Sequence, residues 1–197
     1  LVKAMRALAV EAGIEQPNWK RWVELTLDYK NEPVIEVPVR QENVRRWAEG
    51  LDLPIGGETI MFVDCEAAFY RTSVARSTAQ LLKAAGVEFG LMREQWCCGG
   101  PAAEMGYVAA SRQLAEHNVA DWRAVGAKRI IAIDPHDYIS FTEDYPDYFG
   151  EAYDFEIVYI TELLAELIRE GRLKLTKPIH RTVTYRDPCR LNKRKGI

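Results

Sequence analysis

Short apolar runs alternate with longer amphipathic segments from Glu58 onward. Five runs have the length and composition of buried strands: 58–65, 87–92, 129–134, 155–160 and 181–187. Three segments between them have the apolar spacing of helices: 73–86, 101–126 and 161–171. Pro101 suits a first helical position, Gly126 a helix stop and Thr161 an N-cap. Strands separated by helices indicate a mostly parallel sheet covered on both faces, so we expect an α/β fold of Rossmann-like architecture.

The first 57 residues have a different pattern. Helical spacing is found at 1–13, ending at Gly13, and again at 18–30. Pro33 and Pro38 then interrupt the chain, and 51–57 has the composition of a linker. We therefore expect a mostly helical arm over 1–57 that packs on a domain formed by 58–197.

Composition excludes several classes of function. The net charge is −3, the pI is about 5.7 and 48% of the residues are hydrophobic, which gives no footprint for nucleic acid. No apolar run reaches the length of a membrane helix, so we expect no direct membrane insertion. The expected location is the cytoplasm, or the inner face of a membrane through a partner. Because the chain opens on Leu1, we expect a segment of a longer protein.

The chain has four cysteines, and two of them are neighbours. Cys97 and Cys98 are poor disulfide partners, because adjacent Cα atoms lie about 3.8 Å apart and an unstrained bridge needs roughly 4.4 to 6.8 Å. Cys65 and Cys189 are scattered along a chain too long to depend on disulfides. We expect reduced thiols that act as metal ligands or redox groups.

Each cysteine follows a predicted strand. Cys65 ends the first strand, Cys97 and Cys98 follow the second, and Cys189 follows the fifth. The carboxyl ends of parallel strands meet at one edge of a sheet, where ligands bind. Converging thiolates need a metal to neutralise them, and soft thiolates select zinc, copper(I) or iron-sulfur clusters. Gly99 lets the backbone approach an inorganic group closely.

These motifs resemble the CCG (cysteine-rich) domain family. Cys65, thirty-one intervening residues and Cys97-Cys98-Gly99 match the first part of its signature. "DPHDY" stands where the family has C-P-x-C-Y, with Asp134 and Asp137 in place of two cysteines. "TYRDPCRL", which contains Cys189, resembles the opening of a second repeat, expected near 180–197. Residues 1–57 resemble the end of a ferredoxin-like domain with its connector.

The resemblance implies an oxidoreductase subunit similar to heterodisulfide reductase subunits B and D and to DsrK-type subunits. Such a subunit holds an iron-sulfur cluster, [4Fe-4S] or non-cubane, and transfers electrons to a disulfide or related sulfur substrate. Implied partners are other subunits of a redox complex: a ferredoxin-type protein, a flavoprotein or a membrane cytochrome. The implied ligands are Cys65, Cys97, Cys98 and Cys189 beside Gly99, with Cys97 and Cys98 also catalytic.

The two aspartates leave alternatives open, because carboxylates are harder ligands than thiolates. Asp134 and Asp137 are cluster ligands, proton-transfer groups or caps of the next helix, and His136 in the same loop shuttles protons, binds metal or caps. The alternative function is a degenerate repeat, metal-free or zinc-binding, that acts as a docking module. The chain has neither a dinucleotide fingerprint nor a histidine spaced to activate a cysteine nucleophile.

Overall fold

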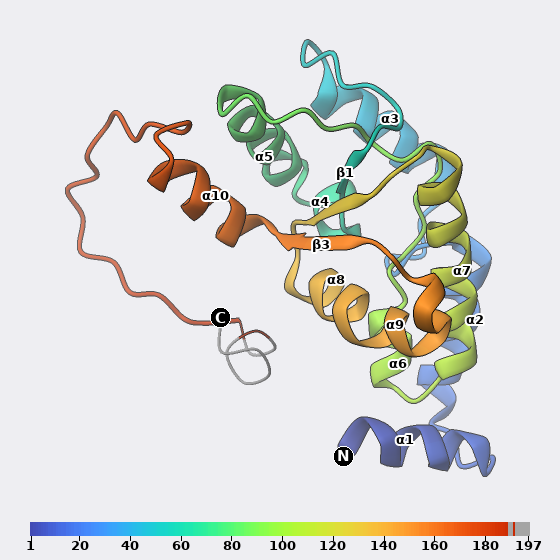
Figure 1. Ribbon diagram of the computed structural model, residues 1–197. Coiled ribbons are helices and arrows are strands. Elements are labelled where there is room, and N and C mark those ends of the chain that lie inside the picture. The colour runs from blue at the N-terminus through green and yellow to red at the C-terminus, as the bar shows by residue number, and fades with distance from the viewer. Residues whose placement is uncertain (189–190, 192–197) are drawn as a thin grey trace.

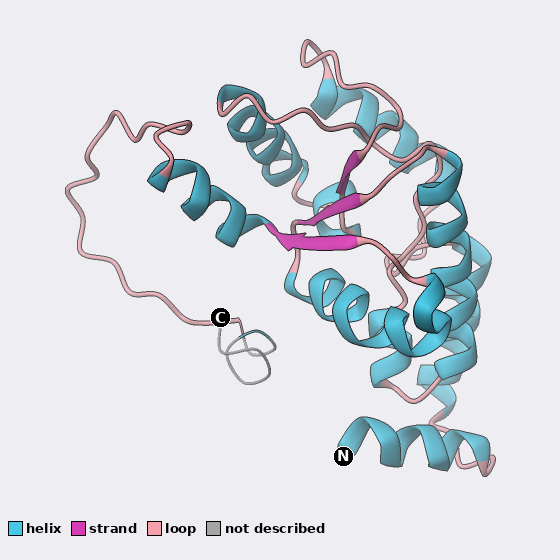
Figure 2. Cartoon of the chain, in the orientation of Figure 1, coloured by secondary structure: helices cyan, strands magenta, loops and turns pink. Residues whose placement is uncertain are grey.

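The computed structural model describes residues 1–188 and 191. Three strands form one parallel sheet in the order β1-β2-β3 (Figures 1 and 2): β1 (Thr59–Phe62), β2 (Arg129–Ala132) and β3 (Glu156–Tyr159). In the register Phe62 lies beside Ala132, which lies beside Tyr159. All three strands therefore end at the same level, and the α/β prediction is confirmed.

The sheet separates two apolar cores, because successive strand residues point to opposite faces. Ile60 and Phe62 pack in one core, whereas Met61 and Val63 pack in the other. Four helices cover the second face: α3 (Val37–Ala48), α4 (Cys65–Phe69), α5 (Thr72–Ala84) and α10 (Ile160–Arg169). Three elements cover the first: α7 (Val108–Ala124), the π-helix η1 (Ser140–Asp144) and α9 (Tyr145–Phe149). The remaining domain helices are short: α6 (Gly100–Glu104), α8 (Pro135–Ile139) and the 3₁₀ turn η2 (Gly150–Ala152).

Two predicted strands are wrong. At 87–92 the structure has only isolated parallel bridges, in which Gly90 lies beside Ile60 and Leu91 beside Ile55. A side chain at Gly90 would collide with the backbone at 54–56, so this crossing depends on a residue that weakens strands. Residues 181–187 have no regular structure and leave Val183 exposed. No strand within the described residues pairs with this segment, and an unpaired strand is not stable.

The predicted helix at 101–126 is two helices, α6 and α7. Gly106 separates them with φ +97°, and a Cβ there would lie 2.5 Å from the carbonyl oxygen of Arg6. The break therefore lets helix α1 approach α6 closely. At the other end α7 stops before Gly126, as predicted. Thr161 is not an N-cap, because α10 starts one residue earlier and Tyr159 takes that position.

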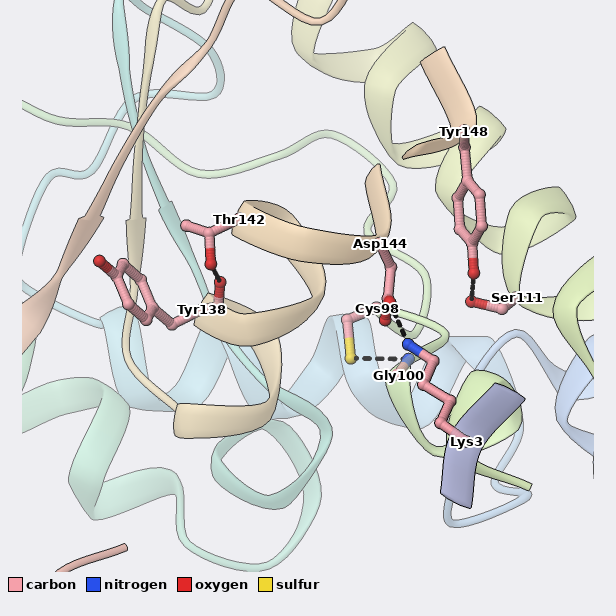
Figure 3. A network of polar contacts seen from close by, with 8 residues as sticks. All are labelled: Lys3, Cys98, Gly100, Ser111, Tyr138, Thr142, Asp144 and Tyr148. Carbon is pink, nitrogen blue, oxygen red and sulfur yellow. Dashed lines mark hydrogen bonds and ion pairs between the residues drawn. The ribbon is translucent and has the colours of Figure 1, made fainter. Parts of the chain in front are cut away.

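Three helices form the N-terminal arm: α1 (Val2–Glu11), α2 (Pro17–Tyr29) and α3. The sequence pattern does not predict α3, because Pro38 is typical of a break; in the structure this proline occupies the first turn of the helix. The arm packs on the domain at several places: α1 contacts α6, α2 contacts α7, and α3 contacts α4 and α5. An ion pair between Lys3 and Asp144 fixes α1 against η1 (Figure 3).

Asn118, on α7, holds the loop that carries the paired cysteines. Its amide oxygen accepts from the backbone N–H of Trp96 at 3.0 Å, and its amide nitrogen donates to the carbonyl of Cys97 at 3.0 Å. The hydroxyl of Tyr145 donates to the carbonyl of Cys98 at 3.1 Å. Asn118 is fully buried, so the loop has no water to replace these bonds.

Gly106→Ala is expected to lower the free energy of unfolding more than Gly126→Ala does. Both glycines have positive φ, so each alanine adds strain of about 1–2 kcal/mol. Only the alanine at 106 also collides with α1, since Gly126 has nothing within 4 Å of its Cβ position. Urea unfolding of the two variants measures the difference. Equal losses would contradict the close approach of α1.

Asn118→Ala is expected to destabilise the chain by about 1–3 kcal/mol for each backbone group left without a partner. The affected groups are the N–H of Trp96 and the carbonyl of Cys97. Glu116→Ala is the control on the same helix, because its exposed pair with Arg112 is worth at most about 1 kcal/mol. Urea unfolding compares the two, and similar losses would rule out Asn118 as the support of the loop.

Candidate metal centre

The carboxyl edge of the sheet carries a cavity of about 260 Å³. Its lining includes the three described cysteines and five acidic side chains: Glu32, Asp64, Cys65, Glu66, Cys97, Cys98, Pro101, Asp134, His136 and Asp137. Cys65 is the first residue of α4, Cys98 lies two residues before α6, and Asp137 lies in α8. The structure thus brings together the described site residues that the sequence indicated. Cys189 lies outside the described residues.

The sulfur atoms form a chain of contacts. Cys65 is within hydrogen-bonding reach of Cys97, Cys97 of Cys98, and Cys98 of the carboxyl group of Asp137. In this chain each thiol donates to the next group. All three described cysteines are buried, and none of them is in a disulfide.

The glycines after the cysteines turn the backbone toward the sulfurs. The N–H of Gly99 donates to Sγ of Cys97 at 3.5 Å, and the N–H of Gly100 donates to Sγ of Cys98 at 3.4 Å (Figure 3). Gly99 has φ +77°, and a Cβ there would lie 2.8 Å from the carbonyl of Ser111. No larger residue fits this turn without displacing α7. The same N–H groups would stabilise negative charge on the sulfurs.

The N-terminal arm closes the site from one side. The loop between α2 and α3 accepts the N–H of Cys97 on the carbonyl of Lys30 at 2.8 Å, and the backbone N–H of Glu32 donates to Cys65. Glu32 also lines the cavity. No sequence signal indicated this contribution, because nothing in the loop resembles a ligand motif.

Burial keeps the thiols protonated in this form. The hydrogen bond to Cys97 and burial raise the pKa of Cys65 well above the ordinary thiol value. The bond from Cys65 lowers the pKa of Cys97, but the bond it donates to Cys98 and its burial outweigh this, so the pKa is raised. For Cys98 the bond from Cys97 lowers the pKa, and burial outweighs it and raises the pKa to about 12. Binding a metal would therefore displace protons.

Burial also raises the pKa values of two carboxyl groups that line the cavity. Burial raises the pKa of Asp137 well above its usual value, and the charges of Asp134 and Asp64 raise it further. Burial also raises the pKa of Asp64 to about 6. Asp64 was not singled out from the sequence, although it directly precedes Cys65 and its place after a strand was a usable signal.

Asp134 and Asp137 have different surroundings. Asp134 is the N-cap of α8, where its Oδ1 accepts the N–H of His136 at 2.7 Å and lies 3.3 Å from Nδ1 of that side chain. Of the three roles considered for Asp134, helix capping is the one whose contact is present in the structure. Asp137 is buried, faces Cys98 and leaves its Oδ2 without a hydrogen-bond partner. His117 lies on α7, stacked on Trp96 at 3.7 Å.

The donor set fits a thiolate-bound centre in its chemistry. Soft sulfur donors with backbone N–H bonds suit an iron-sulfur group better than a hard cation, whereas the unpartnered oxygen of Asp137 is a hard donor. Among the described residues, however, no group of three or more Cys, His, Asp or Glu side chains is arranged to hold a metal ion. The sulfurs contact one another instead of surrounding a common point, so loading would require them to separate.

Comparisons with known proteins identify part of the chain. A family model described as "Cysteine-rich domain" matches residues 59–141, and no solved structure matches significantly. The D-type subunit of dihydromethanophenazine:CoB–CoM heterodisulfide reductase from Methanosarcina mazei is 35% identical over 144 residues, covering 71% of this chain and 35% of that protein. EtfAB:quinone oxidoreductase from Syntrophomonas wolfei is 33% identical over 144 residues, covering 71% and 20%. The probable iron-sulfur-binding oxidoreductase FadF from Bacillus subtilis is 35% identical over 121 residues, covering 61% and 17%.

These matches span about a third of the relatives' length or less. Within the described residues no helix is both long and apolar enough to cross a membrane. The matched region contains the sheet edge, Cys65, Cys97 and Cys98, which are the features on which the resemblance rests. By its sequence match and its cysteines, the region 59–141 of this chain belongs to the cysteine-rich CCG domain family.

Proposed function

We propose that this chain holds an iron-sulfur centre and serves as an electron-transferring subunit of a redox complex that reduces a disulfide or related sulfur substrate. The observation that carries the proposal is the meeting of three buried cysteines from two distant segments at the carboxyl edge of the sheet. Each of the three sulfurs already accepts a backbone N–H bond, from Glu32, Gly99 or Gly100. Thiols in contact with one another are costly to ionise, and an inorganic cation offsets that cost.

The proposed ligands are Cys65, Cys97, Cys98 and Cys189, with Gly99 giving room for close approach. When bound, the cluster, [4Fe-4S] or non-cubane, would supply one-electron transfer. Gly99 and Gly100 stabilise the thiolates through their N–H groups. Cys97 and Cys98 line the cavity, and we assign the contact with the sulfur substrate to them.

The proposed partners are other subunits of the complex, such as a ferredoxin-type protein, a flavoprotein or a membrane cytochrome. The names of the relatives support this, since they describe a reductase subunit and an EtfAB:quinone oxidoreductase. A cytoplasmic location, or attachment to the inner face of a membrane through a partner, stays a prediction.

A second candidate is a docking module that binds zinc or no metal. Asp134 and Asp137 stand where the family has cysteines, and the described donors do not surround a common point. In this case the thiols would stay in contact with one another in the working protein, and no iron-sulfur cluster would bind between them.

Anaerobic reconstitution of the chain with Fe²⁺ and sulfide is expected to give about four irons and four sulfides per chain, as a four-cysteine site requires. Electron paramagnetic resonance of the oxidised and reduced forms should then show a redox-active centre. Cys98→Ala is expected to lose most of the iron while keeping the fold by circular dichroism. His117→Ala, outside the cavity, is the control that keeps it. A folded chain that binds zinc or nothing would favour the docking module.

Asp137→Cys is expected to increase the iron that survives exposure to a chelator. Asp137 is within reach of Cys98, and the substitution adds a soft donor at a position where one oxygen lacks a partner. Asp137→Ser is the matched control, because it has a similar size and no thiolate. Equal iron retention in the two variants would show that position 137 does not face the centre.

A further inference from the structure

Arg40 is a buried cation beside the cysteine site. It belongs to α3, and its side chain reaches under the end of β1, where Nη2 donates to the carbonyl of Val63. The guanidinium lies 5.7 Å from the ring centroid of Phe69 on α4. Only 7% of the residue is exposed. Arg40 therefore lies next to the chain segment that carries Asp64 and Cys65, on the face of the sheet opposite α7.

The charge of Arg40 has no full counter-charge in the structure. Within the described residues no carboxylate lies at ion-pair distance from it, and its Nη1 is buried without a hydrogen-bond partner. Asp64, next to Cys65, forms no ion pair with Arg40, and its Oδ1 accepts the N–H of Ala67 instead. An arginine cannot lose its proton to escape this burial.

Two other arginines near this face are exposed to solvent and form ion pairs. Arg45 and Arg93 line the neighbouring cavity of about 280 Å³ together with Arg40. Both are largely exposed, and they pair with Glu42 and Asp121. The unpaired charge is thus a property of Arg40 and not of the whole surface.

Burying an unpaired charge is strongly unfavourable unless a negative group lies beside it. Arg40 lies against both ends of the segment that carries Cys65, because it donates to the carbonyl of Val63 before Cys65 and lies over the ring of Phe69 after it. We propose that Arg40 is the internal counter-cation of the centre that the cysteines form. This inference rests on the proposed function: Arg40 would favour the anionic ligands and, through its charge, the reduced form of the centre.

Three variants of the full chain test this. Arg40→Met removes the charge and keeps the length, Arg40→Lys keeps a charge, and Arg45→Met removes a charge from the exposed face of the same helix. After reconstitution with Fe²⁺ and sulfide, Arg40→Met is expected to shift the one-electron equilibrium about tenfold toward the oxidised form, or about 59 mV lower in reduction potential. Arg40→Lys and Arg45→Met should stay near the wild-type potential.

Unfolding of the metal-free variants gives a second readout. The carbonyl of Val63 also accepts from Nε2 of Gln95, so Arg40→Met leaves it with a partner. Metal-free Arg40→Met is therefore expected to be at least as stable as the wild-type chain, whereas the loaded variant should lose iron to a chelator about tenfold faster.

The outcomes separate the two proposals. A wild-type chain that takes up no iron refutes the proposed function and this inference with it. A wild-type chain that loads normally, with the same potential and iron retention in Arg40→Met, refutes the role of Arg40 alone. A metal-free Arg40→Met that is clearly less stable, with an unchanged potential, would assign Arg40 to packing.

Discussion

Buried thiols and carboxyl groups cannot all be charged in the same small cavity. The structure meets this constraint by keeping protons on the cysteines and sharing them along a line of contacts that ends at Asp137. Backbone N–H groups of Gly99 and Gly100 donate to two sulfurs of that line, and the buried guanidinium of Arg40 donates to the carbonyl of Val63, two residues before Cys65. The N–H groups already donate to two of the sulfurs, so the proposed loading with a cluster would mainly require the sulfurs to separate.

The register of the sheet explains why these groups meet. Because β1 and β2 end level with each other, Asp64 and Asp134 occupy equivalent positions beyond them. Each aspartate then caps a short helix with its own carboxylate, on the N–H of Ala67 and of His136. The two strand-to-helix turns are built alike, and both aim the start of a helix at the cavity. One turn carries Cys65 and the other carries Asp137.

The sequence predicted the parts of this arrangement that depend on local pattern. The three strands, α5, α10 and the convergence of Cys65 with Cys97 and Cys98 follow from apolar runs and from parallel topology. The failures depend on distant contacts. The break at Gly106 exists because α1 lies against it, and Arg40 gives no signal until α3 is seen to pack on α4. The outer segments at 87–92 and 181–187 have strand-like composition, but composition does not provide a neighbour to pair with.

The loop between α2 and α3 has a consequence for where this protein can be divided. The family match begins at residue 59, yet Lys30 and Glu32 contact the cysteine backbone and the sulfur of Cys65 from before that boundary. The region that the family model matches therefore does not include all the residues that surround the cysteines. In a relative that shares the matched region but has a different preceding segment, the wall of this cavity would be made of other residues, and the same cysteines would lie in a different environment.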